Sequence, residues 1–146
     1  MVYLTFRAAF NAVHVLWNPK LNDSENLETY GECANPAGHG HRYRFEITVA
    51  SAVDAARPTV ITRSAIERTI QDVLRPVLAN ADLNTAFGRD EFISTGENVT
   101  RAVWDLVEPA LADARLVAVR VIETPKNSFT YFGPGEVSNR VRRMFN

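Results

Sequence analysis

The clearest structural signal in this sequence is the stretch His39-Gly40-His41-Arg42-Tyr43-Arg44-Phe45-Glu46-Ile47-Thr48-Val49. Two kinds of side chain alternate along it. Histidine or apolar residues occupy the odd positions, and polar or charged residues occupy the even positions from 42 to 48. Successive side chains of a β-strand point to opposite faces of the sheet, so this alternation predicts a strand. Because both histidines have odd numbers, their rings are expected on the same side of the sheet.

The segments around this stretch predict three more strands. Residues 2–14 alternate in the same way, residues 116–123 form a run rich in β-branched residues, and residues 129–132 suit a short final strand. The loop of residues 18–38 is rich in Asn, Pro, Gly, Asp and Ser, and a helical turn is expected within it near residues 24–30.

Two amphipathic helices are predicted between the second and third strands. Each follows a Ser-x-x-Glu capping box, formed by Ser64 with Glu67 and by Ser94 with Glu97, and continues with apolar residues at helical spacing. The order strand, strand, helix, helix, strand, strand predicts an α+β domain whose helices cover one face of a sheet. With 146 residues, the chain suits a single domain spanning 1–146.

Composition and charge argue against several classes of partner. Hydrophobic residues make up 46% of the chain and charged residues 23%, and the net charge is −1, so neither nucleic-acid nor membrane binding is indicated. No apolar run is long enough to cross a membrane, and residues 1–8 lack the pattern of a signal peptide. With Cys33 as the sole cysteine, no internal disulfide is available, and a reducing, cytoplasmic setting is expected.

The histidines predict a metal site. The chain contains three of them: His39 and His41 share one face of a predicted strand, and His14 ends the strand pattern before it. If the two strands pair, the three imidazoles converge, and three neutral imidazoles with an open fourth position are typical of catalytic zinc. The open position serves to polarise a substrate oxygen or to activate water. The alternative is that the three are unrelated, half-buried histidines.

Several blocks around these histidines resemble one known family. Phe10–His14 resembles an F-x-A-x-H segment, Gly31–Tyr43 resembles G-x-C-x-N-P-x-G-H-G-H-x-Y, and Ser94–Asn98 resembles S-T-x-E-N. Glu123-Thr124 resembles the acidic residue that closes a third strand. These are motifs of the 6-pyruvoyl-tetrahydropterin synthase and 6-carboxytetrahydropterin synthase family, and the resemblance is collinear over residues 4–133.

The resemblance implies a fold, an assembly and a substrate. The fold would be the tunnelling (T-fold) type, with a four-stranded antiparallel sheet and two helices on one face. Three subunits would close a barrel and two trimers would stack into a hexamer, with active sites at subunit interfaces. The substrate would be 7,8-dihydroneopterin triphosphate, with its side-chain oxygens held by zinc.

The resemblance also implies roles for individual residues. Cys33 would move a proton, Glu123 would anchor the amino-pyrimidine edge of the pterin, and Thr95 and Glu97 would line the same pocket. Each residue has a plainer interpretation. Cys33 could be an inert buried thiol, Glu123 could be a strand end reaching solvent, Thr95 could be a first-turn residue, and Glu97 could be only a capping-box partner.

One segment departs from the family pattern. The family places an Asp-His dyad in an L-D-H-x-x-L-N segment, where this chain has Leu78-Ala79-Asn80-Ala81-Asp82-Leu83-Asn84. Asparagine does not titrate, so Asn80 cannot replace the histidine as a general acid or base, a role typically worth ~10²–10⁴ in rate. Asp82, two residues further on, or Cys33 activated by zinc and loop amides, are the candidate substitutes. Gly96 is a second departure, at a position where the family often has a hydroxyl residue.

Three functional hypotheses follow. The first is a zinc-dependent carbon–oxygen lyase that removes or rearranges the side chain of a reduced pterin. Its product would be a 6-substituted tetrahydropterin, a precursor of the 7-deazaguanine of queuosine, or a 6-hydroxymethyl pterin. The second is a zinc-containing protein that binds a pterin or purine without turnover, which the missing dyad favours. The third is a structural zinc that pins a hexamer and predicts unfolding on chelation.

Overall fold

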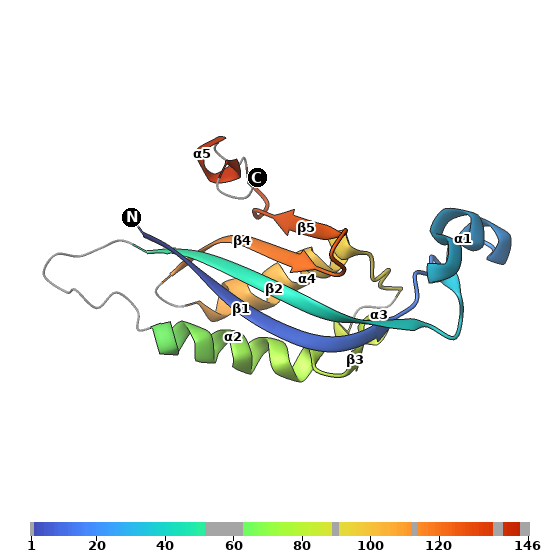
Figure 1. Cartoon of the computed structure of the whole chain (residues 1–146), viewed down its shortest axis with the longest axis horizontal. Helices are drawn as coiled ribbons and strands as arrows, with labels where there is room; N and C mark the ends of the chain where they lie inside the picture. The colour runs from blue at the N-terminus through green and yellow to red at the C-terminus, as the bar shows by residue number, and fades with distance from the viewer. Residues whose placement is uncertain (1, 52–62, 89–90, 112–113, 136–138, 144–146) are drawn as a thin grey trace, which may run out of the picture.

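The structure, a computed structural model, describes residues 2–51, 63–88, 91–111, 114–135 and 139–143. Four antiparallel strands form most of the sheet: β1 (Val2–His14), β2 (His39–Ser51), β4 (Arg115–Ile122) and β5 (Ser128–Tyr131). A two-residue strand, β3 (Ala81–Asp82), pairs parallel with β1 and gives the order β3-β1-β2-β4-β5 (Figure 1). The predicted antiparallel sheet is therefore present, with β3 added at its edge.

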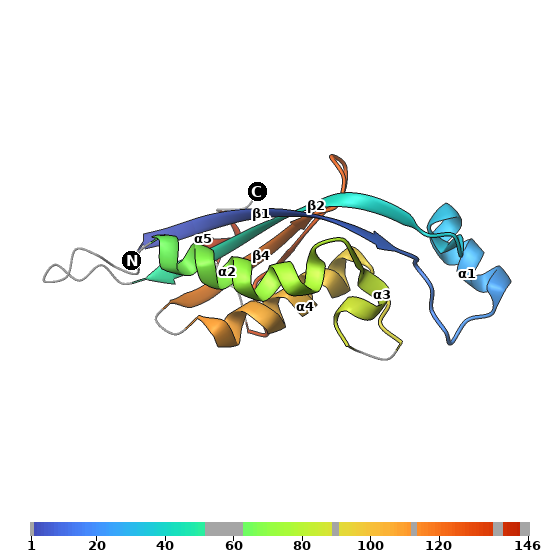
Figure 2. The ribbon, with the colours of Figure 1, turned by 90° about the horizontal axis from the view of Figure 1, so that it is seen from below.

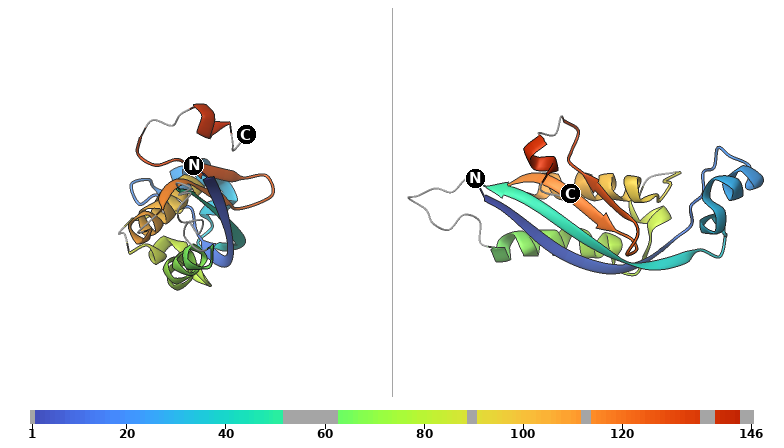
Figure 3. Two further views of the ribbon diagram at one scale, coloured as in Figure 1. Left: turned by 90° about the vertical axis from the view of Figure 1, so that its left-hand side faces the viewer. Right: turned by 45° about the horizontal axis from the view of Figure 1, so that its top comes forward.

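The two long helices, α2 (Arg63–Leu78) and α4 (Gly96–Val107), both lie on one face of the sheet (Figure 2). The α+β prediction is thereby confirmed. The remaining short elements are α1 (Asp23–Tyr30), η1 (Gly31–Ala34), α3 (Leu83–Ala86), η2 (Glu108–Ala110) and α5 (Asn139–Arg142). An end-on view places α5 on the opposite side of the sheet from α2 and α4 (Figure 3). Among the described residues, none of the helices combines the length and apolar character that crossing a bilayer requires.

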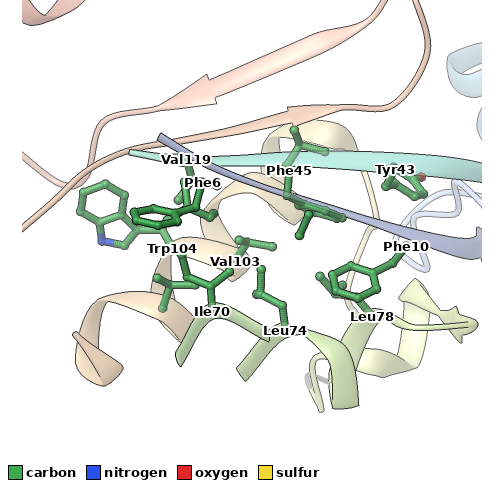
Figure 4. Close-up of a cluster of buried hydrophobic side chains, with 14 of the residues drawn as sticks. Phe6, Phe10, Tyr43, Phe45, Ile70, Leu74, Leu78, Val103, Trp104 and Val119 are labelled. Atoms are coloured by element: carbon green, nitrogen blue, oxygen red, sulfur yellow. The ribbon is translucent and has the colours of Figure 1, made fainter. Parts of the chain in front are cut away.

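The core lies between the helices and the alternating face of the sheet. Phe6 and Phe10 of β1 and Phe45 of β2 meet Leu74 of α2 and Val103 of α4 there (Figure 4). Each is at most 6% exposed, and burial of such side chains stabilises a fold by roughly 1.5–3 kcal/mol apiece. The same parity continues along β2 toward His41 and His39, so one face of the sheet runs from the core into the histidine region.

Both predicted helix starts need correction. The capping box at Ser64 is wrong because α2 already includes Arg63, so Ser64 lies inside the helix. The second helix is capped by Thr95, whose side chain accepts a hydrogen bond from the amide of Asn98, and not by Ser94. Two adjacent hydroxyl residues were both eligible as the cap. Ser94 makes a different contact, described below.

The loop between β1 and β2 is held by a buried asparagine. The side chain of Asn26 accepts from the amide of Asn18 at 2.8 Å and donates to the carbonyls of Asn18, Leu21 and Asn22. The expected helical turn is α1, which begins after a capping box formed by Asn22 and Glu25. The amide of Leu16 donates to the carbonyl of Cys33 at 2.8 Å. The loop therefore returns Cys33 to the end of β1.

Candidate metal centre and ligand site

Pairing of β1 with β2 brings the three histidines together. His14 is the direct partner of His39, and His41 is the partner of Ala12, two residues before His14. The ligating nitrogens of the three rings lie within 4.8 Å of one another. The Nε2 atoms of His14 and His39 are 3.1 Å apart, and two nitrogens bound to one tetrahedral zinc at about 2.0–2.1 Å lie about 3.3 Å apart. The donor set and its spacing fit a zinc ion.

The ring of His14 is oriented by Ser94. His14 is only 2% exposed, and its Nδ1 lies 3.1 Å from the carbonyl oxygen of Ser94 and 3.2 Å from its hydroxyl. A carbonyl oxygen can only accept, so Nδ1 carries the proton and donates it, which leaves the lone pair of Nε2 toward the other histidines. A second partner of this kind is usual for histidines that bind metals.

The backbone just after His14 is clamped as well. Asn84 accepts from the amide of Val15 at 2.8 Å through Oδ1 and donates to its carbonyl at 2.7 Å through Nδ2. The hydroxyl of Ser94 donates to the same carbonyl at 3.3 Å. The end of β1 is thus held by side chains from α3 and from the residue preceding the cap of α4, and His14 has little freedom to move.

Burial keeps two of the rings neutral. The pKa of His14 is lowered from its ordinary value, chiefly by burial, with the neighbouring histidines adding to the effect against the opposing bond to Ser94 and the charge of Glu123. The pKa of His39 is lowered too, first by burial and then by His41. A histidine binds metal through a neutral imidazole. The site therefore favours the protonation state that a ligand needs.

Glu123 follows β4 and reaches the histidine cluster. Its Oε1 lies 3.6 Å from Nε2 of His14 and 3.9 Å from Nε2 of His41, and its side chain is 13% exposed. The amide of Glu123 donates to the carbonyl of Asn127 at 3.1 Å, so the β4–β5 hairpin positions it. The carboxylate therefore points to the cluster and not to open solvent.

Tyr43 links this carboxylate to the core. Its hydroxyl donates to Oε1 of Glu123 at 3.3 Å and lies 3.2 Å from Nε2 of His14. Tyr43 is 1% exposed and stands at the edge of the core cluster (Figure 4). Burial, followed by the charge of Glu123 and the hydrogen bond to it, raises the pKa of Tyr43 well above its usual range. The phenol keeps its proton and acts as a hydrogen-bond donor.

Cys33 lies in η1, on the wall of a pocket of about 760 Å³ that His39 also lines. The thiol is partly exposed. Trp17 and Leu27 contribute apolar surface to the same pocket. The structure thus brings the cysteine and one histidine to a shared space large enough for a small-molecule ligand.

The other predicted ligand-site residues are placed less tightly. Thr95 is partly exposed and caps α4, and Glu97 is exposed in the first turn of that helix. Neither has a contact with the histidine cluster among those of the described residues. The capping-box interpretation of Glu97 is also wrong, because Thr95, and not Ser94, is the N-cap.

The segment that replaces the dyad has a structural role. Ala79 and Asn80 follow the last turn of α2, and Asn80 is exposed with a left-handed φ of 57°. Asparagine adopts that conformation more readily than most residues. The amide of Asn80 donates to the carbonyl of Asn11 at 2.8 Å. Asn80 also lines a pocket of about 400 Å³ with His41.

Asp82 is the N-cap of α3. Its carboxylate accepts from the amide of Asn84 at 2.9 Å and starts α3. It is exposed, and it lines a pocket of about 260 Å³ together with His14 and His39. Among the described residues, no hydrogen bond or ion pair joins its carboxylate to either histidine. The sequence alone did not single out Ser94, Asn84 or Tyr43 as site residues. The sequence did offer a signal for two of them. Tyr43 lies in the motif block that contains His41, and Asn84 lies in the segment that contains Asp82.

A family model described as 6-pyruvoyl tetrahydropterin synthase matches residues 3–134 of this chain. The 6-pyruvoyl tetrahydrobiopterin synthase of Poecilia reticulata is 35% identical over 133 residues, which cover 90% of each protein. The enzyme of the same name from Drosophila melanogaster is 36% identical over 139 residues, covering 92% of this chain and 81% of that one.

The chain belongs to the 6-pyruvoyl tetrahydropterin synthase family. A solved structure of this family, the Caenorhabditis elegans 6-pyruvoyl tetrahydropterin synthase, superposes with a TM-score of 0.82 at 31% identity, covering 91% of this chain and 96% of that one. An uncharacterised protein from Wolinella succinogenes superposes with a TM-score of 0.67 at 13% identity, a likeness of fold alone. The predicted family and its T-fold are confirmed.

Proposed function

We propose that this protein is a zinc-dependent carbon–oxygen lyase that acts on 7,8-dihydroneopterin triphosphate or a related reduced pterin. The observation that carries the proposal is the convergence of His14, His39 and His41 beside Glu123. Membership of a family whose relatives are named 6-pyruvoyl tetrahydrobiopterin synthases supports the pterin as ligand.

The three histidines would hold the zinc. When bound, zinc supplies Lewis-acid chemistry, which acidifies a hydroxyl or polarises a carbonyl oxygen of the substrate side chain. His14 is the most rigidly placed ligand, because Ser94 and the clamped backbone of Val15 fix its ring. His39 and His41 are less buried and line the pockets described above.

Glu123 would orient the pterin ring. A carboxylate accepts two N–H bonds from an amino-pyrimidine edge, and the charged acceptor strengthens both. Tyr43 would keep that carboxylate in place through its hydroxyl, which donates to Oε1. Thr95 and Glu97 would line the pocket at the start of α4, where Thr95 is partly exposed.

Cys33 would carry the proton that the reaction moves. It shares a pocket with His39, and the usual Asp-His partner is absent because residues 79 and 80 are Ala and Asn. Asp82 lines a smaller pocket with His14 and His39, but its carboxylate already caps α3, which makes it a weaker candidate than Cys33. Without a titrating partner, we expect the ordinary family reaction to be slower by ~10²–10⁴, or to be replaced by a different one.

A second candidate function is non-catalytic binding of a pterin or purine at the same zinc centre. The observation that favours it is the structural role of the replaced segment, in which Asn80 ends α2 in a left-handed conformation. Such a protein would keep the histidines and Glu123 and would bind ligand tightly without turnover.

We also propose the assembly and setting of the family: one domain over residues 1–146, a hexamer built from two trimers, and a cytoplasmic location. The hexamer is supported by sheet edges that the described part of the chain leaves unpaired. β1 pairs with β3 only at Ala12 and Val13, and β5 pairs only with β4. Unpaired edges are suited to pairing with further copies. A product on the route to queuosine is one option among 6-substituted pterins.

The test is incubation of zinc-loaded protein with 7,8-dihydroneopterin triphosphate and mass spectrometry of the products. Parallel samples contain a chelator or carry Cys33→Ala. A new pterin that is missing from both controls supports the lyase, and its mass identifies the reaction. Unchanged substrate with measurable affinity supports the binding protein. The absence of affinity, with unfolding on chelation, supports a purely structural zinc.

A further inference from the structure

The ring of Phe129 occupies the space that a side chain at position 96 would fill. A Cβ built on Gly96 would lie 2.0 Å from Cε2, 2.2 Å from Cδ2 and 2.5 Å from Cζ of Phe129. Contacts this short do not occur between real atoms, so any side chain at position 96 requires the ring to move. Gly96 and Phe129 therefore form a matched pair, with no side chain on one partner and an aromatic ring on the other.

This pair lies close to the groups that would hold a ligand. Phe129 is the cross-strand partner of Val121. Glu123 lies two residues beyond Val121, just past the end of β4, and its amide donates to the carbonyl of Asn127, which continues the pairing of the two strands. Such diagonal neighbours are roughly 7–8 Å apart, within reach of an aromatic side chain. On the other side of the pair, Gly96 follows Ser94 by two residues, and Ser94 bonds to His14. Strand register and sequence spacing thus place the pair between the carboxylate and the residue that supports the metal centre.

The partial exposure of the Phe129 ring indicates that it does more than fill space in the core. Val119 and Val121, the neighbouring residues on the same face of β4, are fully buried, whereas Phe129 is only partly buried. Thr95, at the start of α4 beside it, is partly exposed too. Phe129 therefore presents apolar aromatic surface at the place where the core gives way to the ligand site.

We propose that Phe129 is a specificity-determining residue of the proposed ligand site at Glu123. The inference rests on the proposed function and specifies the ligand for the same site. A hydroxyl at position 96 would offer a hydrogen bond, whereas the Gly96–Phe129 pair offers a flat apolar wall. The ligand selected is a planar nitrogen heterocycle that directs its N–H edge to Glu123 and packs its ring against Phe129. Groups that need a hydrogen-bond partner on the Phe129 side are disfavoured.

The test is the affinity of zinc-loaded protein for neopterin, measured by the change in its fluorescence. Stacking on an aromatic residue is worth ~1–3 kcal/mol per base, so we expect Phe129→Val to weaken binding about tenfold. Tyr131→Val is the matched control. Tyr131 lies on the same face of β5, is also partly exposed, and packs on Trp104 with ring centroids 5.4 Å apart. Its truncation is expected to lower Tm but to change the neopterin Kd less than about twofold.

A second comparison keeps the proposal testable if one variant is unstable. Gly96→Ser should lower both Tm and neopterin affinity because it displaces the ring. The double variant Gly96→Ser/Phe129→Val should recover Tm relative to Gly96→Ser while its affinity for neopterin stays below that of the unmodified protein. A Phe129→Val protein that binds neopterin within twofold of the original overturns this inference alone. Failure of the unmodified protein to bind neopterin contradicts the proposed function and the inference together.

Discussion

The histidine end of the sheet and the turn after α2 are both held by hydrogen bonds to neighbouring elements. Only the histidine end keeps the side chains that the family resemblance assigns to the reaction. At the histidine end, Ser94 and Asn84 fix His14 and the residue after it, and the rings converge. In the turn, the amide of Asn80 bonds to β1 and the carboxylate of Asp82 caps α3. The turn keeps its backbone role without the titrating side chains of the family. Structural and chemical roles of one segment are therefore separable.

The largest expected effect comes from returning the missing pair to the turn. Ala79→Asp with Asn80→His restores the family residues, and histidine is among the residues that tolerate a left-handed backbone. If the rest of the site suits the ordinary reaction, turnover of 7,8-dihydroneopterin triphosphate should rise by ~10²–10⁴. Steady-state kinetics would measure this, with Ala79→Asn as a control that changes the same turn without adding a titrating group. An unchanged turnover number would mean that the loss of these two side chains is not what limits the reaction at the histidine end.

Removing a histidine should have the next largest effect. His41→Ala takes away one of the three proposed ligands, and we expect zinc affinity to fall more than the ~10–100-fold typical of losing an outer hydrogen-bond partner. Competition with a fluorescent chelator would measure it. Asn80→Ala, in a residue that shares a pocket with His41, should leave zinc affinity unchanged. An equal loss of zinc affinity in both variants would contradict the assignment of metal binding to the histidine end alone.

Ser94→Ala tests the support of His14. The carbonyl of Ser94 remains as a partner of Nδ1 in this variant, so the expected loss of zinc affinity is near the lower end of the usual range, about tenfold. Thr95→Ala is the neighbouring control. It removes the cap of α4 and should cost about 1 kcal/mol of unfolding free energy without altering zinc binding. An unchanged affinity in Ser94→Ala would show that the hydroxyl is not needed to orient the ring.

The metal-free protein should lose stability in mild acid. Because the pKa values of His14 and His39 are lowered in the folded state, the unfolded chain binds more protons once the pH falls below about 6.5. The stabilising contribution is complete above that pH and decreases as the pH falls through the folded-state pKa values. Urea unfolding of chelator-treated protein between pH 7.5 and about 5 would reveal the slope. His39→Gln should flatten it, and an identical slope would contradict the assignment.

The smallest effect concerns the turn alone. Asn80 has a φ of 57°, so Asn80→Ala should cost about 1 kcal/mol of unfolding free energy, whereas Asn80→Gly should cost less because glycine adopts this conformation freely. Thermal or urea unfolding would compare the two. If alanine proved as stable as glycine, the backbone role assigned to Asn80 would be wrong.

The sequence by itself determined the parity of the strands, the family and the three histidines. Period-2 alternation specifies which side chains share a face, and this is why His39, His41 and Tyr43 could be assigned to one side before any contact was known. The helical turn at α1 was also readable, because Asn22 and Glu25 form a local capping box. Such features depend on residues only a few positions apart, where backbone geometry fixes the spacing.

The family resemblance already assigned Glu123 to the site, but only the tertiary structure decided which side chains hold the histidines and this carboxylate in place. Ser94 and Glu123 reach the cluster across 80 residues of chain, to His14 and Tyr43 respectively, and no local pattern encodes those contacts. Thr95, and not Ser94, caps α4, whereas the hydroxyl of Ser94 lies 3.2 Å from Nδ1 of His14. The fit of Phe129 over Gly96 likewise joins β5 to α4. Packing brings together distant segments whose spacing the sequence does not state, so their roles appear only in three dimensions.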